Sequence, residues 1–114
     1  PGFTVWSGND DSTAAIMALG GKGVISVAAN VVPREMHELT QLCLENRFLE
    51  AGTLQLKLHE LIRALFCEVN PIPVKTSMEL LGLCGGELRL PLCRMSERHL
   101  EQLSHALEPF RPAV

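Results

Sequence analysis

Tyrosine is absent from this sequence of 114 residues, and aromatic residues together make up only 4% of it. A hydrophobic core must therefore be built from aliphatic side chains, which the hydrophobic fraction of 46% supplies. An excess of basic residues is also missing, because the formal net charge is -3. This balance provides no positive surface for nucleic acid or for an anionic membrane, so we predict neither as a partner.

Long apolar runs are absent as well. No window of the sequence approaches the roughly 20 consecutive apolar residues that a membrane-spanning helix needs. The stretch from Pro1 to Thr4 has no basic region followed by an apolar run, so it predicts no signal peptide, and the missing initiator Met indicates processing or truncation. The sequence therefore predicts a cytoplasmic protein.

No pair of cysteines has the C-x-x-C spacing. Zinc sites usually draw on such close pairs, and disulfide scaffolds contain a higher density of cysteine than this chain does. We predict reduced thiols, no metal and no cofactor. The four cysteines are Cys43, Cys67, Cys84 and Cys93.

Hydrophobic spacing and helix-boundary residues predict a mostly helical chain. Asn9 to Ser12 provide capping side chains for the first helix, and Gly20 follows its end. Pro33 begins the second helix, and Ser96 precedes the last one. The predicted helices cover residues 14–19, 33–44, 48–66, 73–83 and the segment from Ser96 to Pro109 and Pro112.

Two short segments, residues 3–7 and 24–28, have the composition of β-strands. The second is apolar on both faces except at Ser26, which is typical of a buried parallel strand. A strand, a helix and a parallel strand form a right-handed unit, but two parallel strands alone do not make a stable sheet. The pattern therefore indicates the end of a larger α/β protein whose other strands lie outside this sequence.

Three short patterns only partly match functional motifs. Residues 20–23, Gly-Gly-Lys-Gly, look like a phosphate-binding loop but precede a strand instead of a helix. The segments that begin at His37 and His59 each contain half of a zinc-protease H-E-x-x-H motif. Asp10 and Asp11 could act as an acid/base pair, but stabilisation of a helix start accounts for both carboxylates.

Four segments, in this order and spacing, are similar to the C-terminal part of the dihydrodipicolinate synthase family. They are SGNDD, LGGKGVISVAANVVPREM, LFCEVNPIPVK and LRLPL. GVISVAANVVP and NPIPVK favour this family over the related N-acetylneuraminate lyases. The family has a (β/α)8 barrel of about 250 residues with a helical extension. The resemblance implies a mostly helical α/β chain: residues 1–46 are the last two β/α units of the TIM barrel, and residues 47–114 are a C-terminal three-helix extension.

The resemblance also implies a lyase of lysine and diaminopimelate biosynthesis that condenses pyruvate with aspartate semialdehyde. In that family a Lys amine forms a Schiff base with pyruvate, the resulting enamine attacks the aldehyde, and a Tyr relays protons. The Schiff-base Lys belongs to a strand before residue 1, and this sequence has no Tyr. Lys22, Lys57 and Lys75 lie in a turn or on helices, so we expect no catalytic residue in this segment and no activity of the chain alone.

Two residues match substrate-binding positions of the family. The resemblance implies that Gly8 lies near the substrate and that Ile25 contributes a main-chain group to pyruvate binding. Ile25 is also expected to be part of the barrel core. Asn70 matches a position in the NPIPVK segment, but we favour the simpler interpretation that it is a turn-forming residue before proline.

Two hypotheses of different classes follow. In the first, the chain functions as part of a full synthase. In the second, it is a non-catalytic domain that self-associates through the open edge of its two strands. Because a cut barrel must bury its apolar surface, either hypothesis predicts a homo-oligomer for the isolated chain.

Overall fold

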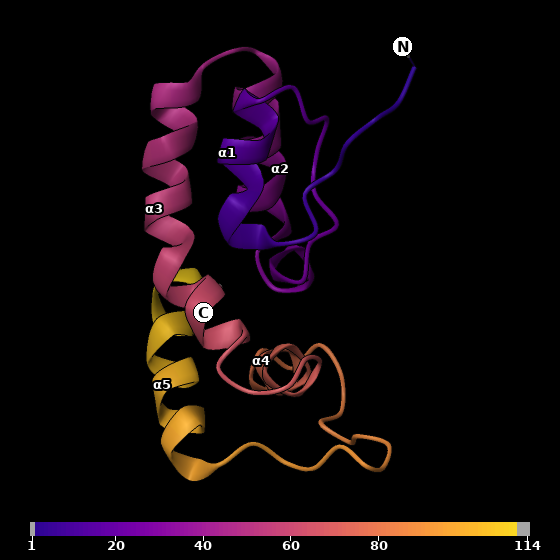
Figure 1. The fold of residues 1–114 in the computed structure, drawn as a ribbon. Helices are drawn as coiled ribbons and strands as arrows, with labels where there is room; N and C mark the ends of the chain where they lie inside the picture. The colour runs from indigo at the N-terminus through magenta and orange to yellow at the C-terminus, as the bar shows by residue number, and fades with distance from the viewer. Residues whose placement is uncertain (1, 112–114) are drawn as a thin grey trace. The chain divides into compact units, whose positions relative to one another are not determined.

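The computed structural model describes residues 2–111 (Figure 1). These residues form two compact units. The first unit ends at His59, and the second begins at Glu60. The boundary falls inside helix α3 (Phe48–Leu65), so this helix contributes its first turns to one unit and its last turns to the other. No helix within residues 2–111 has both the length and the apolar character needed to cross a membrane.

The first unit is built around α1 (Thr13–Ala18), α2 (Pro33–Leu44) and the first turns of α3, all of which the sequence predicted as helices. Helix α1 continues from the 3-10 helix η1 (Asp10–Ser12) and packs against α2, as Figure 1 shows. The 3-10 helix η2 (Ala28–Asn30) also packs against α2. The buried aliphatic and sulfur side chains of this unit are Met17, Ala28, Val31, Val32, Met36, Leu39, Leu42, Cys43, Ala51 and Leu58.

The predicted ends of α1 and α2 are confirmed. Gly20 has a φ of +104°, and the N–H groups of Gly20 and Gly21 donate to the carbonyls of Met17 and Ile16 at 3.0 and 2.9 Å. This left-handed residue closes α1 because glycine reaches positive φ without steric cost. Asn46, with a φ of +60°, closes α2 in the same way.

The two predicted strands are reduced to one parallel pair. Ser7 pairs with Val24, and the Ser7 N–H donates to the Gly23 carbonyl while the Ile25 N–H donates to the Ser7 carbonyl, both at 2.9 Å. In regular parallel pairing the Gly23 N–H would donate to the Val5 carbonyl. Here the Lys22 N–H donates to the Val5 carbonyl instead, at 2.9 Å. The parallel orientation agrees with the prediction, whereas the strand lengths were wrong, because the pairing shifts by one residue immediately before this pair.

The second strand also ends earlier than the sequence predicted. Val27 has helical backbone angles (φ −74°, ψ −43°), and η2 begins at Ala28. Ile25 was expected to be part of the core of a whole barrel; in this chain its side chain is 72% exposed.

The second unit is helical. Helix α4 (Ile72–Leu80) packs against α5 (Glu97–Leu107), and the 3-10 helix η3 (Glu108–Phe110) follows. Gly82, at a φ of +71°, ends α4 three residues before the predicted boundary at Leu83. Pro112, a predicted helix stop, lies outside the described residues. The core of this unit consists of Leu61, Ile62, Ala64, Leu65, Ile72, Val74, Leu103, Ala106 and Leu107.

Candidate functional site

The carboxyl end of the Ser7–Val24 pair is the candidate site. Because the two segments run parallel, the residues that follow them, Gly8 and Ile25, emerge at the same edge. Gly8 is exposed, and a Cβ placed on it would meet no atom of residues 2–111 within 4 Å, its two chain neighbours aside. The packing of this chain therefore does not require glycine at position 8, which leaves room for a ligand to approach the backbone.

The main chain of Ile25 presents a carbonyl oxygen at this edge. Its N–H is already used, since it donates to the Ser7 carbonyl at 2.9 Å. Its carbonyl oxygen accepts no hydrogen bond from any donor within residues 2–111. The predicted main-chain group of Ile25 can therefore act here only as an acceptor, and it suits a ligand with an N–H or O–H group.

Sequence reasoning missed the role of Asp10. Its side chain is 1% exposed, and its carboxylate accepts hydrogen bonds from the Ser26 hydroxyl and from the N–H groups of Val27 and Ala28 at 3.0 and 3.1 Å. This carboxylate therefore binds the start of η2, whereas only the exposed Asp11 is left at the start of its own helix. The sequence signal was Ser26, the single polar residue in an otherwise apolar predicted strand.

The three lysines lie in the turn and on the helices where the sequence placed them. Lys22 follows the turn after α1, and Lys57 is on α3; both side chains are exposed. Lys75 is in the first turn of α4 and is half-buried. Lys22 precedes Val24 and therefore lies before the Ser7–Val24 pair, not at its carboxyl end.

The cysteines and histidines contribute no second site. Burial raises the pKa of the Cys43 thiol, and burial together with the neighbouring Glu68 charge raises that of Cys67, so both thiols are poor nucleophiles at neutral pH. His37 and His59, the two half-motif histidines, are exposed. Across residues 2–111, no three His, Cys, Asp or Glu side chains come together as a metal site.

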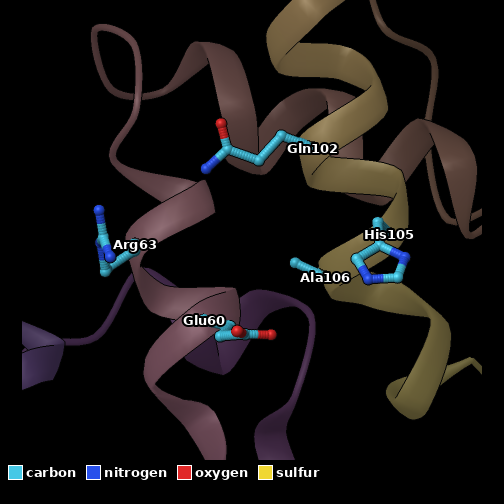
Figure 2. A pocket seen from close by; sticks show the side chains of 5 residues that line it. All are labelled: Glu60, Arg63, Gln102, His105 and Ala106. Atoms are coloured by element: carbon cyan, nitrogen blue, oxygen red, sulfur yellow. The ribbon is translucent and has the colours of Figure 1, made fainter.

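An open pocket of about 180 Å³ lies in the second unit, between the end of α3 and α5 (Figure 2). Glu60 and Arg63 line it from α3, and Gln102, His105 and Ala106 line it from α5. Its four polar side chains are all exposed. The pocket therefore lacks the buried, oriented polar groups that specific binding requires.

A model of the dihydrodipicolinate synthetase family matches residues 1–109. The chain belongs to this family. It is 53% identical over 106 residues to the 4-hydroxy-tetrahydrodipicolinate synthase of Methanocaldococcus jannaschii, an alignment that covers 93% of this chain and 37% of that protein.

Solved structures agree. The crystal structure of dihydrodipicolinate synthase from Aquifex aeolicus superimposes with a TM-score of 0.93 at 49% identity, over 95% of this chain and 37% of that one. A chloride-inhibited dihydrodipicolinate synthase from Acinetobacter baumannii, complexed with pyruvate, gives a TM-score of 0.90 at 40% identity, over 93% of this chain and 36% of that one. The chain thus spans little more than a third of the relatives it matches, and the resemblance to their C-terminal segment is confirmed.

Within the family-like segment LFCEVNPIPVK, Glu68 holds the start of α5. One of its carboxylate oxygens, Oε1, accepts hydrogen bonds from the Ser96 hydroxyl at 2.7 Å and the Ser96 N–H at 3.1 Å, and it lies 2.7 Å from His99 Nδ1. Ser96 was predicted to cap α5, and it is the residue before the helix, but its hydroxyl makes no capping bond to its own helix. Glu68 therefore joins α5 to the segment before α4.

Because of this cluster, the free energy of unfolding of the second unit depends on pH. The hydrogen bonds from Ser96, followed by that from His99, lower the pKa of Glu68 from its usual 4.5. A carboxyl group with a depressed folded-state pKa stabilises the fold above its unfolded-state pKa, and this contribution is lost as the pH falls through the folded-state value.

We expect Glu68→Gln to lower the free energy of unfolding by about 1 kcal/mol at pH 7, because hydrogen bonds to a charged acceptor become bonds to a neutral one. The difference between the two proteins should shrink below pH 4.5 and vanish once Glu68 is protonated. Urea titrations from pH 7 to pH 3 measure this. Glu101→Gln, at an exposed position on α5, is the control. A gap between wild type and Glu68→Gln that stays constant with pH would contradict the assignment.

Proposed function

We propose that the chain acts as the closing part of a dihydrodipicolinate synthase, a lyase that condenses pyruvate with aspartate semialdehyde. In this proposal, residues 1–46 supply the last two β/α units of a TIM barrel, and residues 47–114 supply the helical extension. The chain contributes the pyruvate-facing edge at Gly8 and Ile25, and a preceding segment contributes the Schiff-base Lys and the Tyr. The complete enzyme would be a cytoplasmic homo-oligomer.

The observation that carries the proposal is the parallel Ser7–Val24 pair with Gly8 and Ile25 at its carboxyl end. Active sites of TIM barrels are built at the carboxyl ends of the strands, which is where both residues lie. Gly8 leaves open space, and Ile25 presents an unpaired carbonyl within the described residues. The complex of the Acinetobacter baumannii relative with pyruvate supports pyruvate as the ligand of this edge.

By itself the chain lacks two groups that this reaction needs. It contains no tyrosine to relay protons. Schiff-base formation at neutral pH needs a Lys that is desolvated or otherwise held at a lowered pKa. Lys22 and Lys57 are exposed to water instead. Lys75, which is half-buried, lies in the second unit and follows the NPIP turn instead of a strand end.

A chimera tests the proposal. In the Methanocaldococcus jannaschii synthase, the C-terminal segment that matches this chain is replaced by residues 1–114. Pyruvate and borohydride are added to the chimera and, separately, to the isolated chain, and intact and peptide masses are measured. We expect one reduced pyruvate adduct on a Lys of the archaeal portion of the chimera, condensation activity with aspartate semialdehyde, and no adduct on the isolated chain.

Two controls make the experiment decisive. The unmodified archaeal enzyme shows that trapping works, and circular dichroism shows that the chimera is folded. A folded chimera that traps no pyruvate would overturn the proposed contribution of this chain. An adduct on Lys22, Lys57 or Lys75 of the isolated chain would overturn its inactivity.

A second candidate, a non-catalytic domain that self-associates, is favoured by one observation. The first unit exposes large apolar side chains around its paired segments: Phe3, Val5, Trp6, Leu19 and Ile25. Surfaces of this kind are usually covered by other protein. Size exclusion with light scattering is therefore combined with the pyruvate-trapping experiment. Dimers or larger species of the isolated chain, together with an inactive chimera, support the second candidate. A stable monomer argues against it.

A further inference from the structure

Regular parallel pairing stops immediately after Ser7, at the edge where the site lies. In a parallel ladder, a residue such as Ser7 bonds to the two residues that flank its partner on the other strand. The Ile25 N–H donates to the Ser7 carbonyl. The next bond of a regular ladder would run from the Asn9 N–H to the Ile25 carbonyl. That bond is not formed. The Asn9 N–H instead donates to the Ser7 hydroxyl oxygen at 3.3 Å.

The Ser7 side chain holds Asn9 in this alternative arrangement from both ends. Its hydroxyl donates to the Asn9 carbonyl at 2.6 Å while its oxygen accepts from the Asn9 N–H. Serine commonly closes such local turns and thereby competes with regular backbone pairing. Because Ser7 is fully buried, water does not replace these bonds. The consequence is that the Ile25 carbonyl loses the donor that ordinary pairing would have given it.

The chain on the other side of Ile25 is anchored equally firmly. Asp10 binds the Ser26 hydroxyl and the N–H groups of Val27 and Ala28, and the Ser26 oxygen also accepts the Ala29 N–H at 2.9 Å. The Ile25 N–H is bound to Ser7. The peptide group between Ile25 and Ser26 is therefore held from both sides while its carbonyl oxygen has no partner within residues 2–111.

We propose that Ser7 is a positioning residue, which keeps the Ile25 carbonyl free as an acceptor for the N–H or O–H group that forms when an amine adds to pyruvate. A carbonyl oxygen repels a carboxylate but attracts a protonated imine or the hydroxyl of the preceding adduct. Ser7 does not touch the substrate; it acts by withholding the Asn9 N–H. This inference rests on the proposed function for the identity of its ligand. The Ser7–Asn9 hydrogen bonds themselves are present in this chain alone.

The change of hydrogen-bond partner of the Asn9 N–H is tested by NMR on the isolated chain labelled with ¹⁵N and ¹³C. Scalar coupling across a hydrogen bond identifies its two ends directly. In the wild-type chain we expect no coupling between the Asn9 amide nitrogen and the Ile25 carbonyl carbon. In Ser7→Ala that coupling should appear, because the N–H is released to the regular pairing. Ser12→Ala removes a nearby hydroxyl that donates its hydrogen bond to Asp11 and should leave the spectrum of Asn9 unchanged. Absence of the new coupling in Ser7→Ala would overturn the inference.

The catalytic consequence is tested in the chimera described above. We expect Ser7→Ala to lower kcat/KM for pyruvate about tenfold, and Ser12→Ala to leave it unchanged. A purely structural role of Ser7 would lower the melting temperature and leave kcat/KM, measured well below that temperature, as in the wild type.

The two possible failures are distinguishable. If the wild-type chimera is active and Ser7→Ala retains its kcat/KM, the positioning role is overturned while the proposed function stands. If the folded wild-type chimera traps no pyruvate, the proposed function and the ligand assigned to Ile25 fail together, and the NMR result alone decides whether Ser7 controls the pairing of Asn9.

Discussion

Leu58→Ala is expected to lower the free energy of unfolding of the first unit by about 3 kcal/mol, the typical cost of a fully buried leucine. Leu58 lies on α3 with an exposed fraction of 0%. Gln55, one turn earlier on the same helix, donates to the Asp10 carbonyl at 3.0 Å and accepts the Ala14 N–H at 3.2 Å, so this face of α3 is docked onto the start of α1. Truncation would leave a cavity that the anchored helix is not free to close.

Leu56→Ala is the matched control for Leu58→Ala. Leu56 lies two residues away on the same helix with an exposed fraction of 75%. The chemical change is the same, but little buried surface is lost, and alanine has slightly higher helix propensity than leucine. We expect a change within about 0.5 kcal/mol. Denaturant titrations of both variants measure the difference, and equal losses would show that α3 does not bury Leu58 in solution.

Asp10→Ala should be comparably destabilising, by about 3 kcal/mol, for a different reason. The substitution removes a buried acceptor and leaves the Val27 and Ala28 N–H groups and the Ser26 hydroxyl without their partner. Hydrogen bonds to a charged group contribute about 1.5 to 3 kcal/mol, and buried donors left unsatisfied carry a desolvation penalty. Part of this loss is offset because a charge no longer has to be buried.

Asp11→Ala separates this effect from the general loss of a negative charge at a helix start. Asp11 is the neighbouring exposed carboxylate, and its side chain accepts one hydrogen bond, from Ser12. Its removal should change the free energy of unfolding by less than about 1 kcal/mol. Hydrogen exchange provides the local measurement: in Asp10→Ala the Val27 and Ala28 amides should exchange faster, and in Asp11→Ala they should not. Unchanged protection of both amides in Asp10→Ala would contradict the assigned bonds.

The helices could be predicted from the sequence because their determinants are local. The start of α2 at Pro33, its end near Asn46 and the closure of α1 at Gly20 all depend on backbone preferences of single residues. The periodic leucines of α3 likewise place Leu58, Leu61 and Leu65 on a buried face without knowledge of what covers it.

The strands and the site could be predicted only in outline. Composition identified residues 3–7 and 24–28 as extended and parallel, but not that Lys22 takes the Val5 carbonyl or that Asp10 turns the chain at Val27. These bonds join residues about 16 to 18 positions apart. Their formation depends on which donors meet in space, and no short sequence pattern encodes that.

The sequence by itself determined the family, the helical character and the absence of a tyrosine, because these follow from residue identity and local spacing. Only the tertiary structure decided that the Ser7 hydroxyl hydrogen-bonds to Asn9 and that Asp10 is buried against residues 26–28. It thereby decided which main-chain group of Ile25 has no partner within residues 2–111. The physical reason is that a backbone N–H or C=O is used once its partner is close and aligned, and proximity between distant segments exists only after the chain has folded.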